Sequence, residues 1–195
     1  ISGTWRITQA GAPDGSGAYT GTVTLQKING DVYSVKWQTS VGNYVGVGIL
    51  QGDNLYVGWG IDAGFGVAVY TQNGNILAGK WATSDGTGAT GTETVTLAGS
   101  NLVGTHAITG GNPGGGGTYN GTLSIAQTGD TYSFKWTTGS TQYTGVAIKL
   151  GNTLVVGWGM GSNYGVVHYG FRGNNAIGKW AVPGMPALAT ENIAR

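Results

Sequence analysis

Side chains that could carry acid–base or nucleophilic chemistry are few in this chain of 195 residues, which has eight Asp and Glu, two His and no Cys. A paired-carboxylate site needs two acids facing one cleft, but most of the acids sit in turns and only Glu93 and Glu191 fall in the middle of predicted strands. Neither His lies near a Gly-x-Ser-x-Gly elbow, and the glycine run 114–117 lacks the Lys and Ser or Thr of a phosphate-binding loop. We therefore expect a flexible loop at 114–117, no catalytic residue, no metal, no cofactor and no enzymatic activity.

An internal duplication organises these side chains. The segment YSVKWQTSVGNYVGV, starting at Tyr33, matches YSFKWTTGSTQYTGV, starting at Tyr132, at eight of fifteen positions with an offset of 99 residues. The motifs VGWG and GKW recur with the same offset. Self-similarity at a fixed period indicates repeated structural units. We predict two copies of one β-barrel domain, at 1–98 and 99–195.

Within each copy, short alternating segments are separated by Gly, Asn and Asp turns, which is typical of hairpins. Strands are expected near 3–9, 18–28, 31–39, 43–51, 54–60, 65–72, 76–83 and 91–98, with the second copy in register. An open meander would leave two unpaired edges, and closure removes them. The predicted fold class is therefore all-β, with two tandem eight-stranded up-and-down barrels similar in architecture to avidins and lipocalins.

Alternation along the strands assigns their faces. Leu55, Val57 and Trp59 are expected in a barrel interior, and so is the set 65, 67 and 69. The opposite face of these strands is rich in Gly and Ala, which permits close approach of another surface. We expect the two barrels to pack through these walls as a pseudo-dimer.

Charged residues recur at matching strand positions in both copies. Two interpretations are open for these residues. In the first, Lys and Glu form structural ion pairs or act as polar anchors inside the barrels. In the second, each Lys faces solvent and its aliphatic stem lies on the sheet. The candidate ion-pair residues are Lys36, Glu93, Lys135 and Glu191.

Aromatic residues suggest both a core and a binding surface. Tryptophan on the apolar face of a strand is typical of a core, although Trp faces also stack on sugars. The predicted structural core is Trp37, Trp59, Trp81, Trp136, Trp158 and Trp180. Tyrosines on the opposite face are expected to be exposed and to contact a ligand, namely Tyr44, Tyr56, Tyr70, Tyr143 and Tyr169.

Differences between the copies point to specialisation of the second. Trp5 is replaced by His106, Val69 by His168 and Asn73 by Arg172, and these three are further candidate ligand-binding residues. By alternation both His are expected to point into the second barrel. Either that interior is polar and holds a small ligand or water, or each His makes only local hydrogen bonds.

A family resemblance rests on GTYNG, GDTYSFKW, YTGV, GNTLVVGWG, GKW and TE in copy two, and on YTG, GDVYSVKW, YVGV, GDNLYVGWG, GKW and GTET in copy one. This pattern resembles a largely uncharacterised family of exported bacterial β-repeat proteins rich in Gly and Trp, some of which are labelled fibronectin-binding. The GTW of the first strand and the meander also resemble avidin-like barrels, without the polar biotin-site pattern. Neither resemblance implies a mechanism.

Composition limits the partners. Only 9% of residues are charged and the formal net charge is +1, so nucleic acid is not an expected partner. No apolar run reaches 18 residues, and strands of seven to nine residues are short for a bilayer, so we expect no transmembrane protein. The chain starts with Ile rather than Met, from which we expect a processed, exported protein. The expected function is recognition of a protein, glycan or small ligand; the alternative is a structural or accessory subunit of a surface layer or larger complex.

Overall fold

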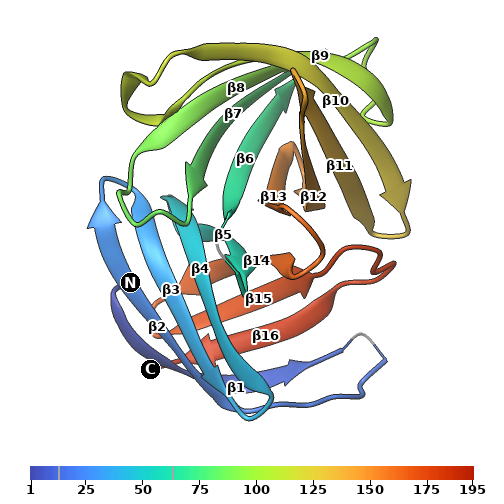
Figure 1. The fold of residues 1–195 in the computed structure, drawn as a ribbon. Coiled ribbons are helices and arrows are strands. Elements are labelled where there is room, and N and C mark those ends of the chain that lie inside the picture. The colour runs from blue at the N-terminus through green and yellow to red at the C-terminus, as the bar shows by residue number, and fades with distance from the viewer. Residues whose placement is uncertain (13, 63) are drawn as a thin grey trace.

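The computed structural model describes residues 1–12, 14–62 and 64–195, and within them almost every element is a strand (Figure 1). The chain runs through β1 (Gly3–Gly11), β2 (Gly21–Asn29), β3 (Val32–Thr39), β4 (Gly42–Gln51), β5 (Asn54–Gly60), β6 (Phe65–Asn73), β7 (Ile76–Thr83), β8 (Thr90–Thr96), β9 (Gly104–Gly111), a 3-10 turn η1 (Pro113–Gly115), β10 (Thr118–Thr128), β11 (Thr131–Thr138), β12 (Thr141–Leu150), β13 (Thr153–Gly159), β14 (Tyr164–Arg172), β15 (Asn175–Ala181) and β16 (Ala189–Ala194). Part of the predicted loop 114–117 thus belongs to the 3-10 turn, whose Gly114 and Gly115 have positive φ. None of the helical segments in the described residues is long and apolar enough to cross a membrane.

The strands close into two antiparallel barrels of eight strands each, which confirms the predicted fold class. The first barrel has the order β1-β16-β15-β14-β5-β4-β3-β2, and the second has β10-β11-β12-β13-β6-β7-β8-β9. In Figure 1 the blue and red ends of the chain form one barrel, and the green to brown middle forms the other. Every strand pairs with two neighbours, so neither sheet has a free edge.

The barrels do not coincide with the sequence repeats, so the prediction of one barrel at 1–98 and another at 99–195 is wrong. The second barrel is an uninterrupted meander from β6 to β13, whereas the first combines β1–β5 with β14–β16. The exchange occurs where β6 pairs with β13, with Val67 opposite Gly157, and β14 pairs with β5. Because LYVGWG in β5 and LVVGWG in β13 are nearly the same strand, β6 finds an equivalent partner in either copy.

The barrels pack against each other at this crossing, which confirms the prediction of two packed walls. A Cβ added to Gly58 would lie 1.9 Å from the carbonyl oxygen of Gly66, and one added to Gly157 would lie 2.0 Å from that of Gly165. Only glycine fits so close to a backbone. The links between the barrels also touch, because the Ile61 N–H donates to the Asn163 carbonyl at 3.2 Å.

The walls are more apolar than expected, because the predicted phase of β6 is inverted. Phe65, Val67 and Val69 face the interface between the barrels, while Ala68 and Tyr70 belong to the second barrel's interior. The interface core also contains Val32, Val47, Ile49, Tyr56, Ala82, Val146, Ile148, Val155, Tyr164, Val166 and Ala181. The strands at this interface are therefore buried on both faces and have no polar face. For that reason the alternation of residue types did not show which side chains of β6 point into the barrel.

One end of each barrel is filled by side chains. In the first barrel Trp5 is 1% exposed, its ring lies 5.1 Å from that of Phe171, and the Arg195 guanidinium stacks 4.3 Å from the Trp5 ring. His106 takes the position of Trp5 in the second barrel and is also buried. The opposite end of each barrel is not filled and carries the candidate site.

Candidate functional site

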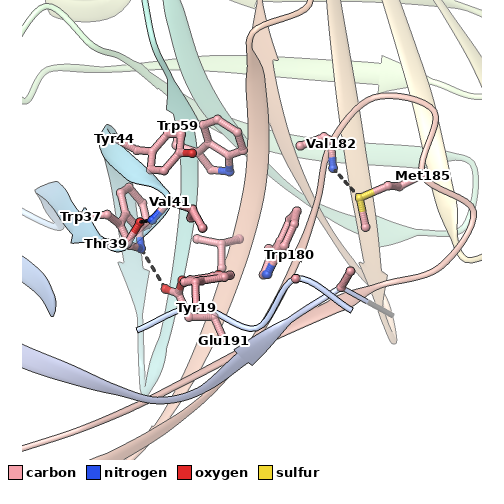
Figure 2. A pocket seen from close by; sticks show the side chains of 13 residues that line it. Tyr19, Trp37, Thr39, Val41, Tyr44, Trp59, Trp180, Val182, Met185 and Glu191 are labelled. Carbon is pink, nitrogen blue, oxygen red and sulfur yellow. Dashed lines mark hydrogen bonds between the residues drawn. The ribbon is translucent and has the colours of Figure 1, made fainter. Parts of the chain in front are cut away.

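Each barrel contains a cavity at the end away from Trp5 or His106. The cavity of the first barrel, here the first cup, has a volume of about 380 Å³. Its main lining residues are Tyr19, Trp37, Thr39, Tyr44, Trp59, Val167, Trp180 and Glu191 (Figure 2). The second cup, in the second barrel, has about 370 Å³ and is lined by Ala68, Tyr70, Trp81, Thr83, Glu93, Asn112, Tyr119, Trp136, Thr138, Tyr143 and Trp158.

The two cups share most of their lining positions, and each combines both sequence repeats. Trp59 from copy one and Trp180 from copy two share the first cup, and Trp158 and Trp81 share the second. Other equivalent pairs are Tyr19 and Tyr119, Trp37 and Trp136, Tyr44 and Tyr143, and Glu191 and Glu93. A single repeat therefore contains no complete cup.

A buried glutamate forms the polar centre of the first cup. Glu191 is 4% exposed, and its Oε1 accepts hydrogen bonds from Trp37 Nε1 at 2.8 Å and from the Tyr169 hydroxyl. Its Oε2 accepts from the Tyr19 hydroxyl at 2.6 Å. Figure 2 shows the indole nitrogen of Trp37 directed at Glu191, with Trp59 and Trp180 bordering the same space.

The second barrel repeats this network around Glu93, which is 5% exposed. Its Oε1 accepts from Trp136 Nε1 at 2.9 Å and from the Tyr70 hydroxyl at 2.7 Å, and its Oε2 accepts from the Tyr119 hydroxyl at 2.7 Å. Three donors directed at two oxygens match the acceptor pattern of a carboxylate.

Strand alternation explains why these acids point inward. In β16 the burial alternates so that Ala189, Glu191 and Ile193 are buried, and in β8 Gly91, Glu93 and Val95 are. Glycine on the neighbouring strand makes room for the tyrosine that reaches the acid. A Cβ on Gly178 would lie 2.8 Å from the Tyr169 ring, and one on Gly79 would lie 2.4 Å from the Tyr70 ring.

The tyrosines of the networks are held in the protonated form. Burial is the main cause and the adjacent glutamate charge the second, and together they raise the pKa of Tyr70 and Tyr169 well above the usual value of 10. The same causes raise the pKa of Tyr19 and Tyr119. These hydroxyls therefore remain hydrogen-bond donors over the whole neutral and mildly alkaline range.

The predicted Lys–Glu ion pairs do not form. Lys36 and Lys135 are exposed on the outside of the barrels, while Glu93 and Glu191 are inside. Neutral Tyr and Trp donors take the place of the expected cation. Among the described residues the only salt bridge joins Lys80 Nζ to Asp31 Oδ2 at 3.8 Å on the surface. The interpretation of solvent-facing Lys is confirmed for Lys36 and Lys135. Of the other interpretation, the polar anchors inside the barrels are confirmed for Glu93 and Glu191, and the ion pairs are not.

The candidate aromatic residues fall into different places. Trp37 and Trp136 are buried as predicted. The other four, Trp59, Trp81, Trp158 and Trp180, are half-buried: they pack against the core clusters on one side and form walls of the cups on the other. Tyr44 and Tyr143 line the cups at a half-buried level. The predicted exposure of Tyr56, Tyr70 and Tyr169 is wrong, because Tyr56 packs in the interface and the other two bind the glutamates.

The two histidines and Arg172 lie outside both cups. His106 does point into the second barrel, where its Nδ1 accepts from the Ala98 N–H at 3.0 Å and its Nε2 is 2.7 Å from the Leu102 carbonyl oxygen. His168 belongs to the first barrel and not to the second. It stacks on Tyr56 and its Nε2 is 2.8 Å from Asn54 Oδ1. Arg172 is exposed at the end of β14.

Two residues of the networks, Tyr19 and Tyr119, were not predicted from the sequence as site residues. Both stand in a Tyr-x-Gly motif at the same place in each repeat, and this shared position was the available signal. Only in the folded barrels do their side chains reach the acids on β16 and β8, across the intervening strands β1 and β9. No group of three or more His, Cys, Asp or Glu able to hold a metal occurs among the residues with described positions.

Comparison of the chain with family models, with curated proteins and with solved structures gives no match.

Proposed function

We propose that the protein is a binding protein that takes up one small ligand in each cup. The observation that carries this proposal is the pair of matching cavities of about 380 and 370 Å³, each with aromatic walls around one buried carboxylate. Cavities of this size, mostly apolar and with a few placed polar groups, are typical of small-molecule sites. An eight-stranded barrel has an interior wide enough for one such ligand.

Side-chain size at two equivalent positions tests the proposal. Val167 in the first cup and Ala68 in the second are buried wall residues on β14 and β6. The double variant Ala68→Phe/Val167→Phe should fill both cups, and each single variant should fill one. Ile177→Phe, at a position 62% exposed on β15, is the control for adding an aromatic ring.

Ligand-observed NMR with a mixed library of small amines, sugars, carboxylic acids and neutral aromatics is the measurement. We expect hits with the wild-type protein and the Ile177→Phe variant, half the binding capacity in each single variant, and none in the double variant. Hits that persist in a folded double variant, or no hits with the wild-type protein, would overturn the proposal. Circular dichroism verifies that each variant is folded.

A further inference from the structure

We propose that the ligand of each cup is an organic cation, a substituted ammonium group with an apolar body; this inference rests on the proposed function. Each cup contains one buried carboxylate. Glu93 and Glu191 are 5% and 4% exposed, and among the residues with described positions the one salt bridge, Lys80 with Asp31, involves neither of them. Buried charges are usually paired, because an unpaired one is costly. A cationic ligand would supply the missing partner.

The hydrogen bonds leave room for that partner. A carboxylate has about four acceptor positions on its two oxygens. Oε1 of Glu191 accepts from Trp37 and Tyr169, while Oε2 accepts only from Tyr19. The same arrangement holds at Glu93, where Oε2 accepts a hydrogen bond from the Tyr119 hydroxyl at 2.7 Å, besides the two bonds to Oε1. One acceptor position therefore remains on the oxygen shared with Tyr19 or Tyr119.

The walls complement a cation in a second way. The faces of Trp and Tyr rings carry negative electrostatic potential and attract ammonium groups. In the first cup Trp59 and Tyr44 form an edge-to-face pair with centroids 5.3 Å apart, and Trp180 also lines the cavity. In the second cup Trp158 makes edge-to-face contacts with Tyr143 at 5.7 Å and with Trp81 at 6.2 Å.

A sugar fits the first cup less well, because several of its polar side chains are already hydrogen-bonded, and among the described residues Trp180 Nε1 is the one buried side-chain donor left without a partner. The Thr39 hydroxyl donates to the Gly42 carbonyl at 2.6 Å, and the Tyr19 hydroxyl donates to Glu191. Few groups remain for the many hydroxyls of a sugar, each of which loses water on binding. An alkylammonium ion needs only a negative charge and apolar or aromatic contact.

Matched probes test the charge of the ligand directly. Choline and its neutral isostere 3,3-dimethylbutan-1-ol have nearly the same shape and differ in the charge of the head group. Isothermal titration calorimetry and tryptophan fluorescence should show two sites for choline and at least about tenfold weaker binding of the isostere. Methyl glucoside is the sugar probe and acetate the anionic probe.

Substitution of each glutamate tests which cup binds choline. Glu191→Gln should weaken choline binding in the first cup by about tenfold or more and leave the second site unchanged, and Glu93→Gln should do the reverse. If either glutamine variant fails to fold, Trp59→Leu and Trp158→Leu remove an aromatic wall of one cup each, because the indoles that hydrogen-bond to the glutamates are those of Trp37 and Trp136.

The outcomes separate the two proposals. Preference for choline over the isostere, lost with the glutamate or the tryptophan of one cup, supports the cation. Equal binding of the isostere, or tighter binding of methyl glucoside or acetate, overturns the cation and keeps a small-ligand site. No binding of any probe overturns the cation, and the library screen then decides whether the cups bind small ligands at all.

Discussion

The two barrels share the centre of their cups and differ at their closed ends. Around Glu191 and Glu93 the same three donors occur in both, two Tyr hydroxyls and one Trp indole. At the closed end, the first barrel stacks Trp5 with Phe171 and Arg195, whereas the second places His106 between two backbone groups of its own β8–β9 connection. Both ends are sealed, but by different chemistry.

The closed end of the first barrel depends on the chain ends. Arg195 Nη2 donates to the Ile1 carbonyl at 2.7 Å, so the seal of the first barrel uses both termini. The second barrel lies in the middle of the chain and has no terminus for this purpose. Because His106 Nδ1 accepts from the Ala98 N–H, its Nε2–H donates to the Leu102 carbonyl oxygen. The glutamate networks, in contrast, use only side chains within strands or next to them and are the same in both.

The crossing between the barrels should be the most sensitive place. We expect Gly58→Ala and Gly157→Ala to lower the free energy of unfolding by about 3 kcal/mol each, or to prevent folding, because the new Cβ meets backbone. Gly170→Ala on β14 is the control, since its Cβ would be 3.8 Å from the nearest atom. Chemical denaturation measures all three. A fully stable Gly58→Ala protein would contradict the close packing of the barrels.

Alkaline pH should destabilise both barrels together. The pKa of Tyr70 and Tyr169 is raised in the folded protein, so their contribution to stability is complete below pH 10 and is lost as pH rises above it. The expected loss is about 1.4 kcal/mol per pH unit for each tyrosine. Tyrosine absorbance followed with unfolding should show both ionising only as the protein unfolds. Ionisation of all ten tyrosines near pH 10 in a folded protein would disagree with this.

Removal of one tyrosine hydroxyl tests whether the two networks are equivalent. Tyr70→Phe and Tyr169→Phe should each lower the free energy of unfolding by about 2 kcal/mol, because each breaks a hydrogen bond to a buried carboxylate. Tyr33→Phe is the control, a buried tyrosine whose hydroxyl has no hydrogen bond in the part of the chain described. Thermal denaturation compares the three, and a loss confined to one barrel would refute the equivalence.

The smallest expected effect concerns His168, which has Val69 as its counterpart in the second barrel. Burial lowers the pKa of His168 from 6.5, so its contribution is complete above pH 6.5 and is lost as pH falls below that value through the lowered pKa. We expect the wild-type protein to lose less than about 1 kcal/mol between pH 7 and 5 from this group. His168→Val should remove that part of the pH dependence, measured by urea unfolding at both pH values. An unchanged pH profile would show that His168 does not contribute.

Much of the fold was predictable, because its signals are local. The turns at Asn-Gly and Gly-Asn pairs and the alternation in VYSVKWQT located the strands, and β3 matches the expected 31–39 to within one residue. The phase of β6 was not predictable, since FGVAVY has apolar residues on both faces. The site was predictable only in part. Tyr44 and Tyr143 were found, and polar anchors inside the barrels were one of the alternatives for Glu93 and Glu191. The neutral donors around each acid were not predictable, because they come from three other strands or loops that only the folded barrel brings together.

The sequence by itself determined a duplicated all-β chain with closed barrels, because hairpin turns and the need to pair strand edges act within each repeat. Only the tertiary structure decided that β14–β16 of the second copy complete the first barrel and that β6–β8 of the first copy complete the second barrel. The strands LYVGWG and LVVGWG are nearly equal pairing partners for β6. Which of them pairs with β6 therefore depends on the packing of the apolar interface between the barrels and on Gly58 and Gly157 within it. That choice brings Trp59 beside Trp180 and Trp158 beside Trp81, and so completes both cups.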